Sequence, residues 1–208
     1  GLVQINNSFS GQNYLPYSIA LLQTYVQKFA VEPQRYEFLT PLYKRVRIAD
    51  AVEAMKHADL VGFSTYVWNG RISLEIARRL KQLKPGIVIA FGGPHVPDQP
   101  EAFLRAHPQI DLAVHNEGER TFLKLLETWP DREAWAGLAG VSMVKADGSF
   151  VRNPNIDRVR DLDEIPSPFL EGAFDSIMKA NPGEAKFVKQ NAAAHVSGIL
   201  LQQLTDTK

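Results

Sequence analysis

The chain of 208 residues contains no cysteine, and this absence excludes several kinds of site. Without thiols there is no disulfide, no zinc–thiolate centre, no cysteine nucleophile and no iron–sulfur cluster held by this chain. A reducing compartment fits such a composition, and we expect a cytoplasmic protein.

The chain also lacks net charge, because 23 Lys and Arg residues balance 23 Asp and Glu residues. No overall field therefore favours nucleic acid or an acidic membrane as a partner. Long apolar runs are missing as well: none approaches the roughly 20 residues of a membrane span. Residues 1–6 lack the basic and apolar regions of a signal peptide. We expect a soluble protein that binds neither nucleic acid nor membrane.

Several motifs of nucleotide binding and catalysis are absent too. No Gly-x-Gly-x-x-Gly follows the first expected strand and no Gly-x-x-x-x-Gly-Lys-[Ser/Thr] occurs, so dinucleotide and P-loop sites lack their phosphate cradles. No Gly-x-Ser-x-Gly elbow positions a hydrolase nucleophile. His95 and His115 both follow expected strands, but no third metal ligand is evident beside them. The sequence therefore predicts neither catalytic residues nor a metal site in this chain.

Apolar runs and helical periodicity alternate along residues 1–138. Short, β-branched runs without alternation are typical of strands buried on both faces of a parallel sheet. Such runs occupy 2–5, 60–63, 87–91 and 111–114, and a weaker strand is expected at 36–40. Amphipathic segments predict helices near 16–29, 48–57, 72–83, 100–106 and 121–129. This pattern predicts an α/β fold, a doubly wound, flavodoxin-like or Rossmann-like five-stranded parallel sheet in the order 2-1-3-4-5.

The periodicity changes after residue 138. Two short segments flank Asp147-Gly148, a pair suited to a tight turn, and predict a β-hairpin over 139–157 that extends the same domain. Residues 158–183 are charged and interrupted by prolines, so we expect a linker that leaves the domain. Residues 184–208 show scattered helical spacing, and no role is assigned to them.

Three of the expected strands end abruptly in small or polar residues. Because the carboxyl ends of parallel strands meet at the ligand-binding edge of an open α/β sheet, we expect these loops to form one crevice. Gly92 and Gly93 permit close approach by a ligand, although a tight strand exit forced by Pro94 explains them as well. Ser64 and Thr65 can hydrogen-bond a ligand or cap the next helix.

Together, three segments resemble the N-terminal cobalamin-binding domain of B12-dependent radical S-adenosylmethionine (SAM) enzymes. They read Ser64-Thr65-Tyr66, Phe91-Gly92-Gly93-Pro94-His95-Val96 and Val114-His115-Asn116-Glu117-Gly118-Glu119. Residues 162–169 are similar to the stretch that leads into the radical SAM barrel of that family, and the resemblance covers approximately residues 2–182. It implies cobalamin as the cofactor and a radical SAM barrel, in cis or in trans, as the partner. SAM and the [4Fe-4S] cluster would belong only to that missing domain.

The resemblance implies a corrin ring across the carboxyl edge of the sheet and a dimethylbenzimidazole tail beside the strands. Ser64 and Thr65 would line the tail pocket, and Glu117 and Gly118 would border its nucleotide end. The loops at 6–13 and 66–69 would face the corrin. The full set of implied cofactor-binding residues is Ser8, Phe9, Ser10, Gly11, Ser64, Thr65, Tyr66, Val67, Trp68, Gly92, Gly93, Pro94, His95, Asn116, Glu117 and Gly118.

Two features depart from the patterns of cobalamin and radical SAM proteins. Residues 6–13 contain no histidine, so the Asp-x-His-x-x-Gly motif that supplies a lower cobalt ligand in methionine-synthase-like domains is absent. The resemblance therefore implies cobalamin bound base-off, with its tail displaced from cobalt and no histidine ligand. The Cys-x-x-x-Cys-x-x-Cys motif is also missing, so the chain resembles the non-catalytic, cofactor-binding part of a methyltransferase-like enzyme.

Two other functions fit parts of the same pattern. A flavodoxin-like FMN-binding electron-transfer protein would place Ser8, Ser10 and Gly11 around the phosphate and Trp68 on the flavin. A nucleotide-sugar-binding half of a transferase would use the segment Gly92-Gly93-Pro94-His95.

Overall fold

The computed structural model describes residues 1–9 and 12–180. Residues 1–173 form one compact unit, and a second unit begins at Phe174 and includes α7 (Asp175–Ala180). The first unit thus includes the beginning of the expected linker. The expected tail at 184–208 lies outside the described residues, as do Ser10 and Gly11 of the first loop.

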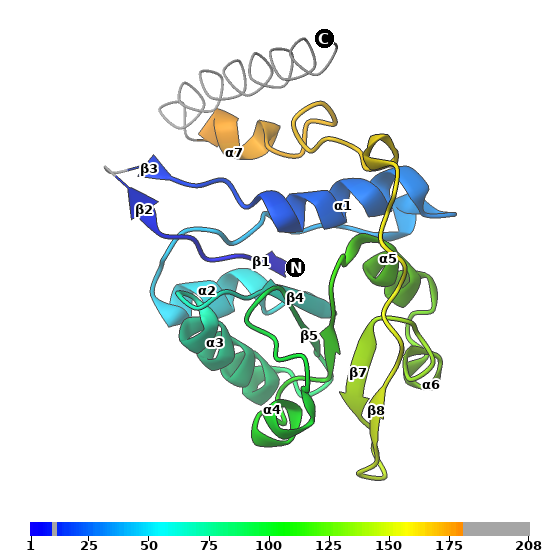
Figure 1. The fold of residues 1–208 in the computed structure, drawn as a ribbon. Coiled ribbons are helices and arrows are strands. Elements are labelled where there is room, and N and C mark those ends of the chain that lie inside the picture. Colours follow the sequence, from blue (N-terminus) through cyan, green and yellow to red (C-terminus); the bar gives the residue numbers. More distant parts are fainter. Residues whose placement is uncertain (10–11, 181–208) are drawn as a thin grey trace, which may run out of the picture. The chain divides into compact units, whose positions relative to one another are not determined.

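A six-stranded sheet in the order β1-β4-β5-β6-β7-β8 forms the centre of the first unit (Figure 1). Its strands are β1 (Leu2–Val3), β4 (Leu60–Ser64), β5 (Val88–Gly92), β6 (Leu112–Val114), β7 (Val141–Val144) and β8 (Phe150–Arg152). The first four strands are parallel, and β7 and β8 add to them in antiparallel pairing. The expected hairpin after residue 138 is therefore present, with Gly148 at φ 82° in its turn, and it extends the sheet.

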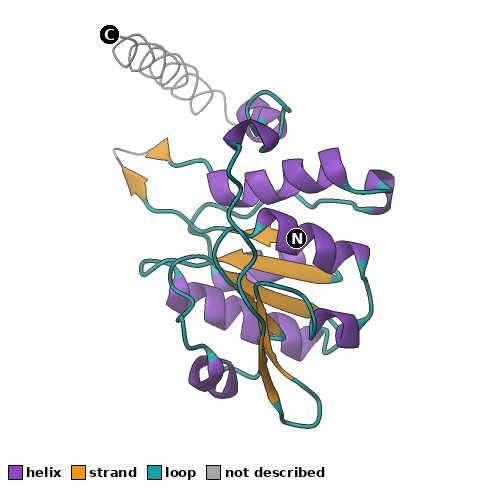
Figure 2. Cartoon of the chain, turned by 45° about the vertical axis from the view of Figure 1, so that its right-hand side comes forward, coloured by secondary structure: helices purple, strands orange, loops and turns teal. Residues whose placement is uncertain are grey.

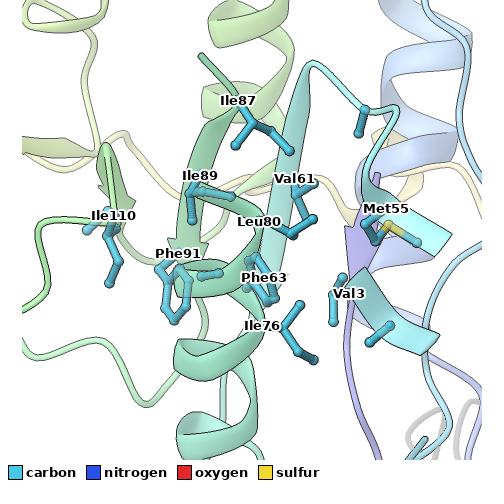
Figure 3. Close-up of a cluster of buried hydrophobic side chains, with 14 of the residues drawn as sticks. Val3, Met55, Val61, Phe63, Ile76, Leu80, Ile87, Ile89, Phe91 and Ile110 are labelled. Atoms are coloured by element: carbon cyan, nitrogen blue, oxygen red, sulfur yellow. The ribbon is translucent and has the colours of Figure 1, made fainter. Parts of the chain in front are cut away.

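Helices cover both faces of this sheet (Figure 2). One face carries α1 (Tyr17–Phe29), α5 (Glu119–Glu127) and the short α6 (Arg132–Trp135); the other carries α2 (Ile48–Met55), α3 (Gly70–Leu83) and α4 (Glu101–Ala106). Successive strand residues point to opposite faces. Leu60 and Val88 accordingly pack with α1 and α5, whereas Val61 and Ile89 pack in the cluster with α2 and α3 that Figure 3 shows. The predicted Rossmann-like α/β fold is confirmed, but the sheet is mixed and six-stranded, so the predicted five parallel strands in the order 2-1-3-4-5 are not.

The second predicted strand, 36–40, is wrong. That stretch forms no strand, and the edge beside β1 is instead a single parallel bridge between Val3 and Leu42. The Leu42 N–H donates to the carbonyl of Leu2 at 3.0 Å, and the Leu42 carbonyl accepts from Gln4 at 2.9 Å. Tyr36 and Phe38 pack against the α1/α5 cluster, so their alternation reflects packing at the rim of the core and not strand pairing.

Two short elements were not expected. The loop after β1 carries a small hairpin of β2 (Ser8–Phe9) and β3 (Gln12–Asn13). The α6 helix begins after Asp131, whose Oδ1 accepts the backbone N–H groups of Glu133 and Ala134 at 3.0 and 3.1 Å. Such a cap satisfies donors that a helix start leaves without intrahelical partners. None of the helices in the described part of the chain has the length and apolarity needed to cross a bilayer.

Candidate functional site

Side chains on one face of the sheet become smaller toward the carboxyl ends of the central strands. On the face covered by α1 and α5, β4 presents Leu60, Gly62 and Ser64 in turn. The paired residues of β5 are Val88, Ala90 and Gly92. Large side chains fill the layer at the amino ends of the strands. Glycine, alanine and serine leave it open at the carboxyl ends.

This decrease in size opens a cavity of about 220 Å³ between the strands, α1 and α5. Gly62, Ala90 and Gly92 contribute to its sheet side, and Ile19 and Leu22 of α1 and Phe122 of α5 form apolar walls. We call it the carboxyl-edge cavity. Its mixture of apolar walls and few polar groups is typical of sites that bind small molecules.

A chain of polar side chains lies along the α1 side of the carboxyl-edge cavity. Ser18 Oγ donates to Gln4 Oε1 at 2.7 Å and lies 3.0 Å from Ser64 Oγ. The Tyr66 hydroxyl lies 3.5 Å from the same Ser18 oxygen. Gln4 is itself anchored at the end of β1, with its Nε2 3.4 Å from Asn6 Oδ1. The first strand therefore positions two hydroxyl groups at the cavity although it does not line the cavity itself.

Asn69 holds together the loops at the ends of β1 and β4. Its side chain is fully buried; Nδ2 donates to the carbonyls of Ile5 at 3.0 Å and Ser64 at 3.1 Å. Its Oδ1 accepts the Tyr66 N–H at 2.7 Å. A buried polar group with satisfied hydrogen bonds specifies one arrangement of the chain around it.

The loops after β4 and β5 contact each other directly, and Gly93 makes this possible. The residue has φ 92°, and a Cβ there would lie 2.7 Å from the Thr65 carbonyl oxygen. Thr65 is fully buried, and its Oγ1 donates to the Gly92 carbonyl at 2.8 Å. Thr65 and Gly93 thus fix the shape of the cavity mouth.

The loop after β6 forms the opposite wall. Asn116 adopts φ 58°, a left-handed conformation that Asn tolerates better than most residues. Glu117 Oε2 accepts the Val159 N–H at 2.8 Å, which joins this wall to the segment that follows the hairpin. Gly118 approaches α1 so closely that a Cβ on it would lie 3.3 Å from Leu22 Cδ2.

Eight of the sixteen predicted site residues line the carboxyl-edge cavity: Ser64, Tyr66, Gly92, Gly93, Pro94, Asn116, Glu117 and Gly118. Val67 and Trp68 lie outside it and are 85% and 47% exposed, with Trp68 stacked on Tyr66 at a ring distance of 4.6 Å. His95 is exposed next to Gly70, and Thr65 is buried behind the cavity mouth. Ser8 and Phe9 lie in the β2–β3 hairpin.

Sequence reasoning missed the contribution of the helices. Ser18, Ile19 and Leu22 of α1 and Glu119 and Phe122 of α5 line the cavity, as do Gly62, Phe63 and Ala90 of the strands. For the strands a signal exists, because every second residue shrinks toward the carboxyl end. For the helices none does, since their apolar positions have the spacing of any core-facing helix.

Acidic groups dominate the electrostatics of the cavity. Glu117 and Glu119 are its charged lining residues among those described. Burial raises the pKa of the Glu119 carboxyl, its own backbone hydrogen bond opposes the rise, and the charge of Glu117 adds to it. His115 lies off the cavity, where it is within 2.9 Å of Ser142 Oγ, and burial together with Arg152 lowers its pKa. No three His, Asp or Glu side chains of residues 1–9 and 12–180 gather as a metal-binding group.

A larger cavity, about 370 Å³, lies at the other end of the strands beside Leu60 and Asp59. The amino ends of parallel strands are not where open α/β sheets bind ligands, and the loops there carry none of the predicted site residues. The carboxyl-edge cavity is therefore the candidate site.

Comparison with known families matches residues 10–126, more than half of the chain, to the B12 binding domain. The cobalamin-dependent radical SAM methyltransferase TokK of Streptomyces tokunonensis is 32% identical over 163 residues, which cover 78% of this chain and 24% of TokK. The 2-(S-pantetheinyl)-carbapenam-3-carboxylate methyltransferase of Streptantibioticus cattleyicolor is 34% identical over 163 residues, with the same coverage. The chain thus spans about a quarter of the length of these relatives.

Among solved structures, the cobalamin-dependent SAM radical enzyme OxsB with aqua-cobalamin bound superposes with a TM-score of 0.62. The match has 20% sequence identity and covers 83% of this chain and 24% of OxsB, so it shows a shared fold. Nothing in these comparisons supports the FMN alternative. The matched residues include the strands β4, β5 and β6 that line the carboxyl-edge cavity. The chain belongs to the B12-binding domain family.

Proposed function

We propose that this chain holds cobalamin base-off, with the dimethylbenzimidazole tail in the carboxyl-edge cavity and the corrin over the loops at its mouth. The observation that carries the proposal is the paired decrease in side-chain size along β4 and β5, which leaves room for a flat aromatic group beside the strands. A Cβ on Gly62 would lie 3.1 Å from Leu2 Cδ2 and 3.8 Å from Phe122 Cε2, so a larger residue at this position of β4 would crowd its neighbours.

The rim of the cavity suits a large planar ligand. Tyr66 and Trp68 stack on each other at an interplanar angle of 9°, and Trp68 and Val67 are exposed beside the mouth. Exposed aromatic and apolar side chains of this kind mark surfaces that another molecule covers. We assign this rim, together with His95, the β2–β3 hairpin, Ser10 and Gly11, to the corrin.

The proposed base-off state without a histidine ligand is supported by the first loop. Residues 6–13 contain no histidine, and the side chain of Asn6, at the start of this loop, already donates to the carbonyl of Tyr14 at 3.0 Å. When bound, cobalamin supplies a cobalt centre that can carry a methyl group. The residues of this chain bind and orient the cofactor.

We further propose that the whole enzyme is a radical SAM methyltransferase and that this chain is its cofactor-binding part. The relatives TokK and the carbapenam-carboxylate methyltransferase support this, because the chain matches about a quarter of each. A radical SAM domain, in cis or in trans, would then hold SAM and the [4Fe-4S] cluster. The segment at 158–183 would lead to it, and the assembly would work in the cytoplasm without nucleic acid or membrane partners.

Retention of cobalamin by the purified chain tests the proposal. The protein is mixed with hydroxocobalamin, under oxidising and reducing conditions, and freed of unbound cofactor by gel filtration. We expect a corrin absorption spectrum to elute with the protein. Elution of the protein without a corrin spectrum under both conditions would overturn the proposed function.

A further inference from the structure

Glu119 lines the carboxyl-edge cavity, and the proposed function gives it no role. It is the first residue of α5. Its Oε2 atom is buried and has no hydrogen-bond partner among the described residues. A buried carboxyl oxygen without a hydrogen-bond partner lowers the stability of a folded protein. In native structures such an atom usually has a partner, which can be a bound ligand or water.

No neighbouring cation satisfies this carboxyl group. The adjacent Arg120 directs its guanidinium to Glu164, with 2.8 Å between Nη2 and Oε2. Among the residues that the structure describes, neither lysine nor arginine lines the cavity. Burial raises the pKa of Glu119, as described above, so this carboxyl group takes up a proton more readily than it would in water, and its protonated form has an O–H that can donate.

The two serine hydroxyl groups of the cavity already donate within the protein. Ser18 donates its hydrogen to Gln4 Oε1, because that oxygen can only accept. The 3.0 Å contact between Ser18 and Ser64 then requires Ser64 to be the donor. In this arrangement neither serine directs its hydrogen to a ligand, whereas Glu119 Oε2 has no partner among the described residues.

The tail of base-off cobalamin needs a donor of this kind. Once displaced from cobalt, its benzimidazole ring carries one unprotonated ring nitrogen, a hydrogen-bond acceptor on an otherwise apolar group. We propose that the Glu119 carboxyl group binds this ring nitrogen through one hydrogen bond and thereby makes the cavity selective for the displaced tail. The proposal rests on the proposed function and adds the residue that recognises the base.

Comparison of cobalamin with cobinamide, a corrinoid without the nucleotide tail, tests this role. Dissociation constants for hydroxocobalamin and for cobinamide are measured by absorption titration with the wild-type chain, Glu119→Ala, Glu119→Gln and Glu127→Gln. Glu127 is on the same helix and does not line the cavity, so it is the matched control.

We expect Glu119→Ala to bind hydroxocobalamin about tenfold more weakly, equivalent to about 1.4 kcal/mol, and cobinamide with unchanged affinity. Glu119→Gln should stay within about threefold of wild type, because its amide N–H₂ also donates. Glu127→Gln should match wild type for both corrinoids.

Three results would overturn the inference while leaving the proposed function intact: unchanged cobalamin affinity of Glu119→Ala, an equal loss for cobalamin and cobinamide, or Glu119→Gln as weak as Glu119→Ala. Absence of cobalamin binding by the wild-type chain would instead overturn the proposed function, and the inference with it. Circular dichroism of each variant identifies any that fails to fold. If Glu119→Ala does not fold, the affinities of Glu119→Gln for hydroxocobalamin and cobinamide decide the test.

Discussion

Substitution of Ala90 by valine tests whether the carboxyl-edge cavity is the tail site. Ala90 is in the middle of β5, is 4% exposed and lines the cavity. Its partner in β4 is Gly62, which has no side chain to collide with the added methyl groups. Valine also suits a strand, because its β-branched side chain packs well on a pleated surface. The variant should therefore fold, with part of the cavity filled.

The Ala90→Val substitution should raise the stability of the protein and weaken its binding of cobalamin. Two added methyl groups that become buried contribute up to about 1.6 kcal/mol at about 0.8 kcal/mol each. For a chain of this size that corresponds to a rise in Tm of up to about 3–6 °C. A tail that must enter the same space meets an overpacked site, which costs about 1–3 kcal/mol and weakens cobalamin binding on the order of tenfold or more.

The assay combines thermal unfolding with corrinoid titration, and Ala113→Val is the matched control. Ala113 is fully buried in the neighbouring strand β6 but packs on the opposite face, in the cluster with α3 and α4. The same two methyl groups have no cavity to fill there, so we expect a loss of about 1–3 kcal/mol of stability. Cobalamin binding by the folded control should stay at the wild-type level.

Two results would refute the reasoning. Ala90→Val could lower the Tm as much as Ala113→Val, which would mean that no usable space exists beside β5. It could also bind hydroxocobalamin with wild-type affinity while its Tm rises, which would place the tail elsewhere. Cobinamide serves as the internal reference, since its affinity should be the same in all three proteins.

Three further predictions concern the framework of the site. Asp111→Ala should lose about 3 kcal/mol of unfolding free energy in urea, since it leaves Lys81 and Arg132 without the carboxylate that they contact at 2.7 and 2.9 Å; a loss below 1 kcal/mol would contradict this. Asn69→Ala should cost about 2–3 kcal/mol in the same assay and also weaken cobalamin binding, and intact binding would show that the loops keep their shape without it. His115→Asn should reduce the loss of stability between pH 7 and pH 5. The folded pKa of His115 is depressed by burial, so the unfolded chain binds its proton more readily and wild-type stability falls as the pH drops below about 6.5; equal pH slopes for variant and wild type would refute this.

Much of the fold was predictable because local periodicity and tertiary packing agree. The strands at 60–64 and 88–92 have buried residues on both faces, and α1 begins at Tyr17, directly after Pro16. The edge beside β1 was misplaced because Tyr36 and Phe38 alternate as strand residues do, yet they pack on the rim of the core. An alternating sequence pattern does not distinguish a paired strand from a loop segment whose side chains pack on the rim of the core.

The sequence predicted the parts of the candidate site that lie at strand ends and in the loops after them, but not the parts that lie on helices. Gly92, Gly93 and Ser64 follow buried runs directly, so the rule on carboxyl ends finds them. Glu119 was not predicted as a site residue, because an acidic residue in the first turn of a helix is already explained by its favourable interaction with the helix dipole. The contact of Val159 with Glu117 was not predicted either. It joins residues 42 positions apart and uses a backbone N–H, which any residue except proline could supply.

The paired decrease in side-chain size along β4 and β5 has a consequence for mutational scanning. The sheet side of the carboxyl-edge cavity, the recess, is open because Gly62, Ala90 and Gly92 have little or no side chain. Substitution of these residues by alanine therefore removes no atoms from it. An alanine scan changes nothing at Ala90 and adds only one methyl group at each of the two glycines, so it tests the shape of the recess weakly. Scanning with valine or leucine would detect it, and natural variants that lose the cofactor should be sought among gains of bulk at these positions.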